Sequence, residues 1–226
     1  MKDRVFLFDV DNTLLDNDLV QGDLSDHLAQ TYGPAARDRY WTIFEQLRSE
    51  LGYADYLAAL QRYRVEDMHD PKLLLMACWF AQYPFADRLY PGALEAVRHA
   101  QASGETSILS DGDAVFQPLK VARSGLRELF EDRVLIYVHK EQELDDVERW
   151  RPARRYVMVD DKLRLLAAIK QIWGERVTTV WVKQGHYARG PAATAGLSAA
   201  DVEIDRIADF VNLDLSDPVT LRQSRA

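Results

Sequence analysis

The sequence has little cysteine, no long hydrophobic run and no excess of positive charge. Cys78 is the single cysteine in 226 residues, so no disulfide can form within the chain. It lies in the apolar run LLLMACWF, and we expect it to be buried in a helix of a protein from a reducing, cytoplasmic compartment. No stretch approaches the roughly 18 apolar residues of a membrane span, and the N-terminus lacks the apolar core of a signal peptide. We therefore expect no membrane partner.

The charge balance also limits the class of partner. The formal net charge is -8, and an acidic chain has no general attraction for phosphate backbones, so we expect no nucleic-acid partner. A small anionic substrate stays compatible with this charge if a cation or local basic residues receive it. The length suits one large domain or a domain with a small lid, and we leave the choice between monomer and homodimer open.

Short apolar runs alternate with helical patterns along most of the chain. The runs that predict strands are Val5–Val10, Thr106–Leu109, Val134–Val138, Tyr156–Val159 and Val177–Val182. The segments that predict helices between the later runs are Pro91–Gly104, Ala114–Gly125 and Lys162–Gly174. This alternation predicts an α/β fold with a Rossmann-like, doubly wound parallel sheet.

One long segment interrupts the alternation. From about Asp16 to Arg88 the sequence has only helical periodicity, which is roughly 70 residues of helix after the first strand. We interpret this segment as a helical cap. The predicted domains are therefore a catalytic core of residues 1–15 and 89–226 and a cap of residues 16–88. Asp16 and Asp18 are expected to cap the first cap helix or to face solvent.

Polar residues follow the apolar runs where strands are predicted to end. Asp9 and Asp11 lie at the end of the first run and Ser110 at the end of the second. Lys140 lies at the end of the third, and Asp160 and Asp161 at the end of the fourth. Ligands of open parallel sheets bind beyond the carboxyl ends of the strands, so these side chains are expected to line one cleft.

The residue types in this set suit one kind of chemistry. Four carboxylates in a partly buried site do not all stay ionised without a cation, and Mg²⁺ prefers hard oxygen ligands. A carboxylate can also act as a nucleophile toward phosphorus, and a second carboxylate two residues on can move the proton of the leaving oxygen. A hydroxyl and an ammonium group can bind the phosphoryl oxygens.

The same residues resemble the four motifs of the haloacid dehalogenase-like superfamily. DVDNTL (Asp9–Leu14) is similar to the first motif, DxDx[TV], and Ser110 after an apolar strand looks like the second. Lys140 is similar to the third, and VMVDDK (Val157–Lys162) to the acidic fourth. The helical insert between the first two motifs matches the C1 cap position of that family. The resemblance extends from Val5 to about Leu213.

The resemblance implies a role for each matching residue. Asp9 is the implied nucleophile, and Asp11 the implied general acid and base, with its backbone carbonyl on Mg²⁺. Thr13 is implied to hold the loop. Ser110 and Lys140 are implied to bind the phosphoryl group. Asp9 and Asp161 are implied metal ligands, with Asp160 as a second ligand or an orienting residue, and the sequence does not separate the roles of Asp160 and Asp161.

Two departures from the family pattern leave alternatives open. Lys140 lacks the usual following proline, so Lys120 is a second candidate for the phosphate-binding lysine. Asn12 stands where glycine is commoner. Asp111, beside Ser110, is a supporting residue with an undefined contact, and the roles of His186 and Tyr187 are open.

The preferred function is a Mg²⁺-dependent phosphatase that acts on a small phosphorylated metabolite through an aspartyl-phosphate. The alternatives are a 2-haloacid dehalogenase-type hydrolase and a non-enzymatic phospho-acceptor or binding protein on the same fold. In the dehalogenases the second aspartate of the first motif is replaced, whereas Asp11 is present here. A receiver module of the phospho-acceptor kind has no helical insert after its first strand.

Overall fold

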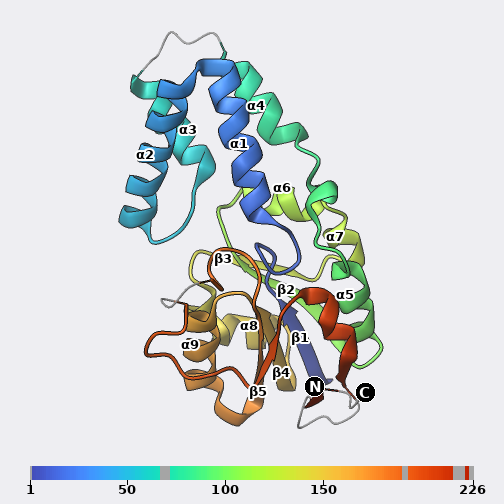
Figure 1. Cartoon of the computed structure of the whole chain (residues 1–226). Coiled ribbons are helices and arrows are strands. Elements are labelled where there is room, and N and C mark those ends of the chain that lie inside the picture. Colours follow the sequence, from blue (N-terminus) through green and yellow to red (C-terminus); the bar gives the residue numbers. More distant parts are fainter. Residues whose placement is uncertain (1, 67–71, 190–192, 216–221, 224–226) are drawn as a thin grey trace.

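The computed structural model describes residues 2–66, 72–189, 193–215 and 222–223, and a six-stranded parallel sheet forms its base (Figure 1). The strands are β1 (Lys2–Phe8), β2 (Glu105–Asp111), β3 (Val134–Tyr137), β4 (Ala153–Asp160), β5 (Val177–Val182) and β6 (Val202–Ile204). Their spatial order is β3-β2-β1-β4-β5-β6, and every neighbouring pair is parallel. This is the Rossmann order, in which the chain changes direction across the sheet between β1 and β4.

The apolar character of the strands follows from burial on both faces. In β1, Phe6 and Phe8 belong to one buried cluster, while Val5 and Leu7 belong to the other. Successive side chains of a strand point to opposite faces, so a strand between two helical layers is apolar at every position. The five strand predictions are confirmed, although β1 ends at Phe8 and not at Val10. β6 was not predicted, because three residues give too short a pattern.

Helices cover both faces of the sheet. The α-helices of this part of the chain are α5 (Ala93–Gln101), α6 (Phe116–Arg123), α7 (Leu126–Leu129), α8 (Leu144–Trp150) and α9 (Leu163–Trp173). The 3-10 segments are η1 (Phe85–Arg88), η2 (Lys140–Gln142), η3 (Gly174–Arg176) and η5 (Ile207–Asn212). A short antiparallel pair, β7 (Leu213–Asp214) with β8 (Arg222–Gln223), completes the described elements. The Rossmann-like α/β prediction is confirmed.

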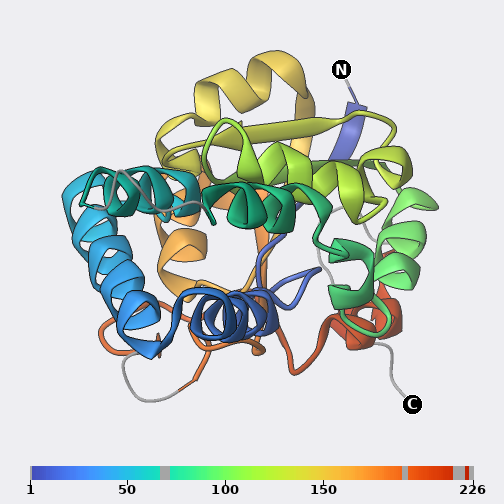
Figure 2. The same cartoon turned by 90° about the horizontal axis from the view of Figure 1, so that it is seen from above.

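Four helices stand apart from the sheet, and we call them the cap helices. They are α1 (Asn17–Tyr32), α2 (Pro34–Leu51), α3 (Tyr56–Glu66) and α4 (Leu73–Gln82). Figure 1 shows them above the sheet, and in the view from above they lie in front of it (Figure 2). The two chain crossings between cap helices and sheet lie side by side, because Asp16 N–H donates to Arg88 O at 2.8 Å. The exact domain boundaries stay a prediction.

The cap helices share one buried cluster with the sheet. The Phe116 ring of α6 lies 5.1 Å from the Tyr56 ring of α3 and 5.2 Å from the Phe80 ring of α4, measured between centroids. Aromatic contacts of this kind stabilise by about 0.5–1.5 kcal/mol beyond area burial. α6 is therefore a core helix on which the cap helices α3 and α4 pack.

Two further sequence expectations concern the burial of Cys78 and the absence of a membrane span. Cys78 is only partly buried, so the expectation of full burial is wrong: it lies on α4 between the buried positions Met76 and Phe80. Within the described part of the chain, no helix has the length and apolar character that crossing a membrane requires.

Candidate active site

A tight loop carries Asp9 and Asp11 out of β1. The Asp9 N–H donates to Val159 O of β4 at 3.0 Å, which continues the sheet by one residue. The chain then turns on Val10, whose carbonyl accepts from Leu14 N–H and Leu15 N–H at 2.9 Å each. The turn needs a residue with positive φ at Asn12, where φ is 59°, and asparagine adopts that region more readily than most residues.

Asp9 is the centre of a buried polar group at the ends of β1 and β2 and at the start of η2, which follows β3. Its Oδ1 lies 2.7 Å from Lys140 Nζ and accepts from Ser110 Oγ at 3.3 Å. Its Oδ2 accepts from Thr13 Oγ1 at 3.3 Å. All four side chains are buried. The structure thus joins residues from three of the four predicted motifs around one carboxylate.

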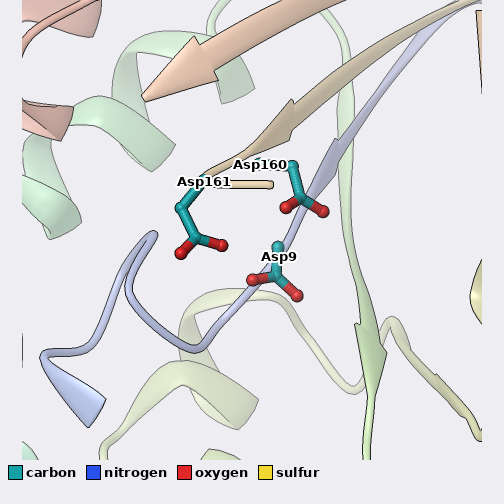
Figure 3. Close-up of side chains that lie close together, drawn as sticks. All are labelled: Asp9, Asp160 and Asp161. Carbon is teal, nitrogen blue, oxygen red and sulfur yellow. The ribbon is translucent and has the colours of Figure 1, made fainter. Parts of the chain in front are cut away.

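The acidic pair after β4 lies beside Asp9. Asp160 Oδ2 is 2.6 Å from Lys140 Nζ, and both side chains are completely buried. Asp161 is also completely buried, and neither of its carboxylate oxygens has a hydrogen-bond partner among the described residues. Oxygens of Asp9, Asp160 and Asp161 lie within 4.8 Å of one another, and Figure 3 shows the three carboxylates around a common space. The donor set suits a hard divalent cation.

The electrostatics differ between these three carboxyl groups. Burial alone raises the pKa of Asp9, but Lys140 and Lys162 outweigh burial, and the pKa of Asp9 is lowered. Burial raises the pKa of Asp160, and Lys140 offsets only part of the increase. Burial raises the pKa of Asp161 well above its ordinary value. The ionised forms of Asp160 and Asp161 are therefore the ones that further positive charge would stabilise.

Lys140 provides the positive charge at the centre of the cluster. Burial alone lowers the pKa of Lys140, but Asp160 and Asp9 outweigh burial and raise it. Its backbone N–H donates to Asp111 Oδ1 at 2.8 Å, which fixes the start of η2 against the end of β2. Asp111, predicted as a supporting residue, is thus in contact with the backbone of Lys140.

Asp11 points to a different lysine. Lys120 Nζ of α6 lies 2.6 Å from Asp11 Oδ1 and 2.8 Å from Asp11 Oδ2. The Asp11 side chain is 24% exposed, whereas Lys120 is completely buried. Of the two lysines that the sequence left open, Lys140 contacts Asp9 and Lys120 contacts Asp11.

Asn12 connects the loop after β1 to the first cap helix. Its Oδ1 accepts from Asn17 N–H at 3.0 Å and from Asp18 N–H at 3.2 Å, and its Nδ2 donates to Asp18 Oδ1 at 2.9 Å. Asp16 caps α1, as predicted, by accepting from Leu19 N–H at 3.0 Å. Asp18 does not cap α1 with its side chain; that side chain is 31% exposed, so it faces solvent in part, as predicted, and its Oδ1 contacts His186 Nδ1 at 2.5 Å.

A cavity of about 180 Å³ lies between the cap helices and the loops of the sheet. Its cap-side lining includes Gln21, Phe44, Arg48, Tyr53 and Tyr56, and its sheet-side lining includes Asp11, Asp111, His139, Lys162 and Tyr187. Tyr187, whose role the sequence left open, accepts from an Arg48 N–H of α2. The loop after β5 therefore closes one wall of the cavity against the cap helices.

Sequence reasoning missed two site residues. Gln117 of α6 is buried and donates from Nε2 to Ser110 Oγ at 3.0 Å. A Cβ on Gly112 would lie 2.5 Å from the Gln117 side chain, so the glycine of SDGD was the available signal of a close approach. Asn17 donates to Tyr56 Oη and accepts from Lys120 Nζ. No local pattern indicated the role of Asn17.

Comparison with known proteins agrees with this geometry. Residues 4–172 match the family model of the haloacid dehalogenase-like hydrolases. A candidate haloacid dehalogenase-like hydrolase from Burkholderia xenovorans LB400 is 59% identical, with a TM-score of 0.89 over 93% of this chain and 96% of that one. A comparison with curated proteins gave no match.

More distant structures share the fold. The L-2-haloacid dehalogenase of Xanthobacter autotrophicus is 18% identical, with a TM-score of 0.61 over 92% of this chain and 97% of that one. The candidate HAD-type hydrolase YfnB of Bacillus subtilis, solved with magnesium bound, gives the same identity and TM-score over 92% and 96%. With the family model covering most of the chain, the protein belongs to the haloacid dehalogenase-like hydrolases.

Proposed function

We propose that the protein is a Mg²⁺-dependent phosphatase that acts on a small phosphorylated metabolite through an aspartyl-phosphate on Asp9. One observation carries the proposal. The buried Asp161 carboxylate has no hydrogen-bond partner among the described residues and lies beside two further buried carboxylates. A buried carboxylate is retained in the ionised form only when a cation or hydrogen bonds compensate it.

The donor set fits Mg²⁺. Asp9, Asp160 and Asp161 offer three carboxylates from the ends of two neighbouring strands, and the backbone carbonyl of Asp11 is a fourth proposed ligand. When bound, Mg²⁺ supplies positive charge that offsets these carboxylates and the negative charge of a phosphoryl group.

The first half-reaction belongs to Asp9 and Asp11. A carboxylate oxygen of Asp9 attacks phosphorus, the bond from phosphorus to the ester oxygen breaks, and Asp11 gives its proton to the departing oxygen. Hydrogen bonds from Thr13 and Ser110 orient the Asp9 carboxylate. The lowered pKa of Asp9 keeps it ionised, as a nucleophile requires.

The second half-reaction returns Asp9 to its starting state. The Asp11 carboxylate takes a proton from water, the water oxygen bonds to phosphorus, and the bond from phosphorus to Asp9 breaks. Inorganic phosphate leaves, and Asp11 is again protonated for the next cycle. Asp11 lines the cavity and is partly exposed, which suits a group that exchanges protons with substrate and water.

Ser110 and Lys140 are the proposed phosphoryl-binding groups. Both contact the carboxylate that would carry the phosphoryl group, so their donors lie near its oxygens. Gln117 donates to Ser110 Oγ, which leaves the Ser110 hydroxyl hydrogen for Asp9 or the phosphoryl oxygens. Donors fixed in advance stabilise charge that moves in the transition state.

The size of the cavity supports a small substrate. A volume of about 180 Å³ is below the usual range for drug-sized ligands. Its lining mixes aromatic side chains with amides and both signs of charge, which suits a compact polar ester. We propose no nucleic-acid or membrane partner.

Dehalogenation is the competing activity. It requires a carboxylate nucleophile but neither a proton donor for the leaving group nor Mg²⁺. A proton donor at Asp11 and three carboxylates grouped as a metal site are more than that reaction requires. The likeness to dehalogenase structures at 18% identity concerns the fold alone.

The test is hydrolysis of p-nitrophenyl phosphate with Mg²⁺ and then with excess EDTA, beside the Asp9→Asn variant. We expect release that requires the metal and that falls by roughly 10³-fold or more in the variant, which keeps its thermal unfolding transition. Undiminished activity of the variant contradicts the proposed nucleophile. Chloride release from 2-chloropropionate, with no phosphate release, would establish the dehalogenase activity instead.

A further inference from the structure

Lys120 is a completely buried lysine that the reaction above does not use. Its Nζ donates to both carboxylate oxygens of Asp11 and, at 2.9 Å, to Asn17 Oδ1. An ammonium group has three donors and no acceptor, so these three contacts use its whole hydrogen-bonding capacity. Burial of an ammonium group is costly unless it is paired in this way.

The contacts fix the direction of the Asp11 carboxylate. Two hydrogen bonds from one nitrogen prevent free rotation of the carboxylate about its last bond. Each oxygen keeps a further lone pair, and Asp11 faces the cavity. Proton transfer requires the acid to be within hydrogen-bond reach of the reacting oxygen, so a fixed direction matters for this residue.

The same lysine depends on the cap helices. Asn17 is the first residue of α1, and its Nδ2 donates to Tyr56 Oη of α3 at 3.3 Å. Gln21 of α1 donates to the same oxygen at 2.9 Å. One turn before Lys120 on α6, Phe116 packs on the Tyr56 ring. Lys120 and its partner Asn17 thus belong to the contact between α6 and the cap helices α1 and α3.

We propose that Lys120 is a positioning residue for Asp11, which it holds, together with Asn17 of the cap, in the direction needed for proton transfer to the leaving group. The proposal rests on the proposed phosphatase function. It assigns Lys120 to the proton donor, whereas Lys140 is assigned to the nucleophile and the phosphoryl group.

Leaving-group basicity gives a readout that a merely structural role does not move. p-Nitrophenyl, phenyl and benzyl phosphate have similar size, but their leaving groups are increasingly basic. A nitrophenolate leaves without a proton, whereas a benzyl alcoholate needs one. The ratio kcat/KM covers the steps up to departure of the leaving group, so it isolates the step in which Asp11 is the acid.

In Lys120→Met we expect kcat/KM for benzyl phosphate to fall by about 10²-fold, and that for p-nitrophenyl phosphate by about threefold or less. Lys120→Arg, which keeps the charge and two donors for Asp11, should restore most of the loss. Asn17→Ala should show the same dependence on the leaving group, with a smaller fall in kcat/KM. In an Asp11→Asn background, Lys120→Met should add no further dependence.

Lys170→Met is the matched control, because Lys170 is a partly exposed lysine that pairs with Asp201 away from the cavity. It should leave all three rates unchanged. The positioning role is overturned if kcat/KM falls equally for all three esters in Lys120→Met and Asn17→Ala, or if it does not fall at all. If the unmodified protein hydrolyses none of the three esters, the proposed function itself fails, and the role of Lys120 falls with it.

Discussion

Two buried lysines contact the two aspartates of the first motif, and they come from different parts of the molecule. Lys140 follows a strand of the sheet and contacts Asp9 and Asp160. Lys120 lies on the helix that carries the cap and contacts Asp11 and Asn17. The Lys140 and Asp9 side chains are both buried from solvent, whereas the Asp11 carboxylate that pairs with Lys120 faces the cavity.

The two lysines therefore have different surroundings. Lys140 lies among buried carboxylates, whereas Lys120 connects the Asp11 carboxylate to the cap helices. Lys140 pairs with the buried carboxylates of Asp9 and Asp160, and its removal leaves both without that counter-charge. Lys120 balances one partly exposed carboxylate and adds an amide contact to the cap. Both lysines are equally buried, so burial alone does not distinguish their roles. In a third pair, Lys170 with Asp201, both side chains are partly exposed, and this pair is the reference for the stability effect of a surface ion pair.

Replacement of Lys140 should have the largest effect. In Lys140→Met we expect a loss of stability of about 3–5 kcal/mol in the absence of metal, because two buried carboxylates lose their counter-charge. Phosphatase activity should fall for every ester, whatever its leaving group. Urea unfolding in the presence of EDTA measures the loss of stability in Lys140→Met. Lys120→Met should lose less stability, because Asp11 can regain water; an equal or larger loss there contradicts the comparison.

Asp161 should determine the response to metal. With Mg²⁺ at about 100 times its dissociation constant, a bound ion adds about 2.7 kcal/mol to stability, and Asp161→Asn should lose most of this gain. Without metal the variant should be at least as stable as the parent, because the amide carries no buried charge.

Thermal unfolding with Mg²⁺ and with EDTA makes the measurement. The control is Asp113→Asn, an acid of the cavity wall outside the buried cluster, which should keep the full Mg²⁺ response. An unchanged Mg²⁺ response in Asp161→Asn would place the ion elsewhere.

Gly185 tests the contact between the loop after β1 and the loop after β5. Its φ is +72°, and a Cβ there would lie 2.5 Å from Asn12 Cβ. Gly125 has φ +80° with no atom within 4 Å of the added Cβ. Gly125→Ala should cost about 1–2 kcal/mol for the left-handed backbone alone.

Gly185→Ala should cost more than Gly125→Ala and should also lower kcat/KM, since Asn12 lies between Asp9 and the cap. Chemical unfolding and kinetics of the two variants are compared side by side. Equal stability loss with unchanged kinetics would show that Asn12 tolerates displacement.

Asp201 should give the smallest effect, with a defined pH dependence. Burial alone raises its pKa, but hydrogen bonds from Thr179 and Lys170 outweigh burial, and the pKa is lowered. A lowered carboxyl pKa stabilises the fold above the ordinary value of 3.8, and the contribution is lost as pH falls through the lower folded value. Asp201→Asn should therefore lose about 1 kcal/mol or less near neutral pH and nothing well below pH 3.8. Urea unfolding at several pH values measures this; a loss that grows toward acid reverses the sign and refutes the assignment.

The sequence by itself determined the sheet and most of the polar group at its edge. Five strands were visible because strands buried on both faces are continuously apolar, as in Val177–Val182. Asp9, Ser110, Lys140, Asp160 and Asp161 were visible because each lies at or within two residues of the end of such a run. In a parallel sheet, the position after a strand already places a residue at the binding edge.

Only the tertiary structure decided which lysine meets which aspartate. Lys120 and Lys140 are 20 residues apart, both lie after the second strand, and no local pattern distinguishes their partners. Their pairing depends on how α6 packs between the sheet and the cap helices, which is a matter of side-chain packing between distant segments. Gln117 and Asn17 escaped prediction for the same reason, since each gains its role from a contact with a residue of another element.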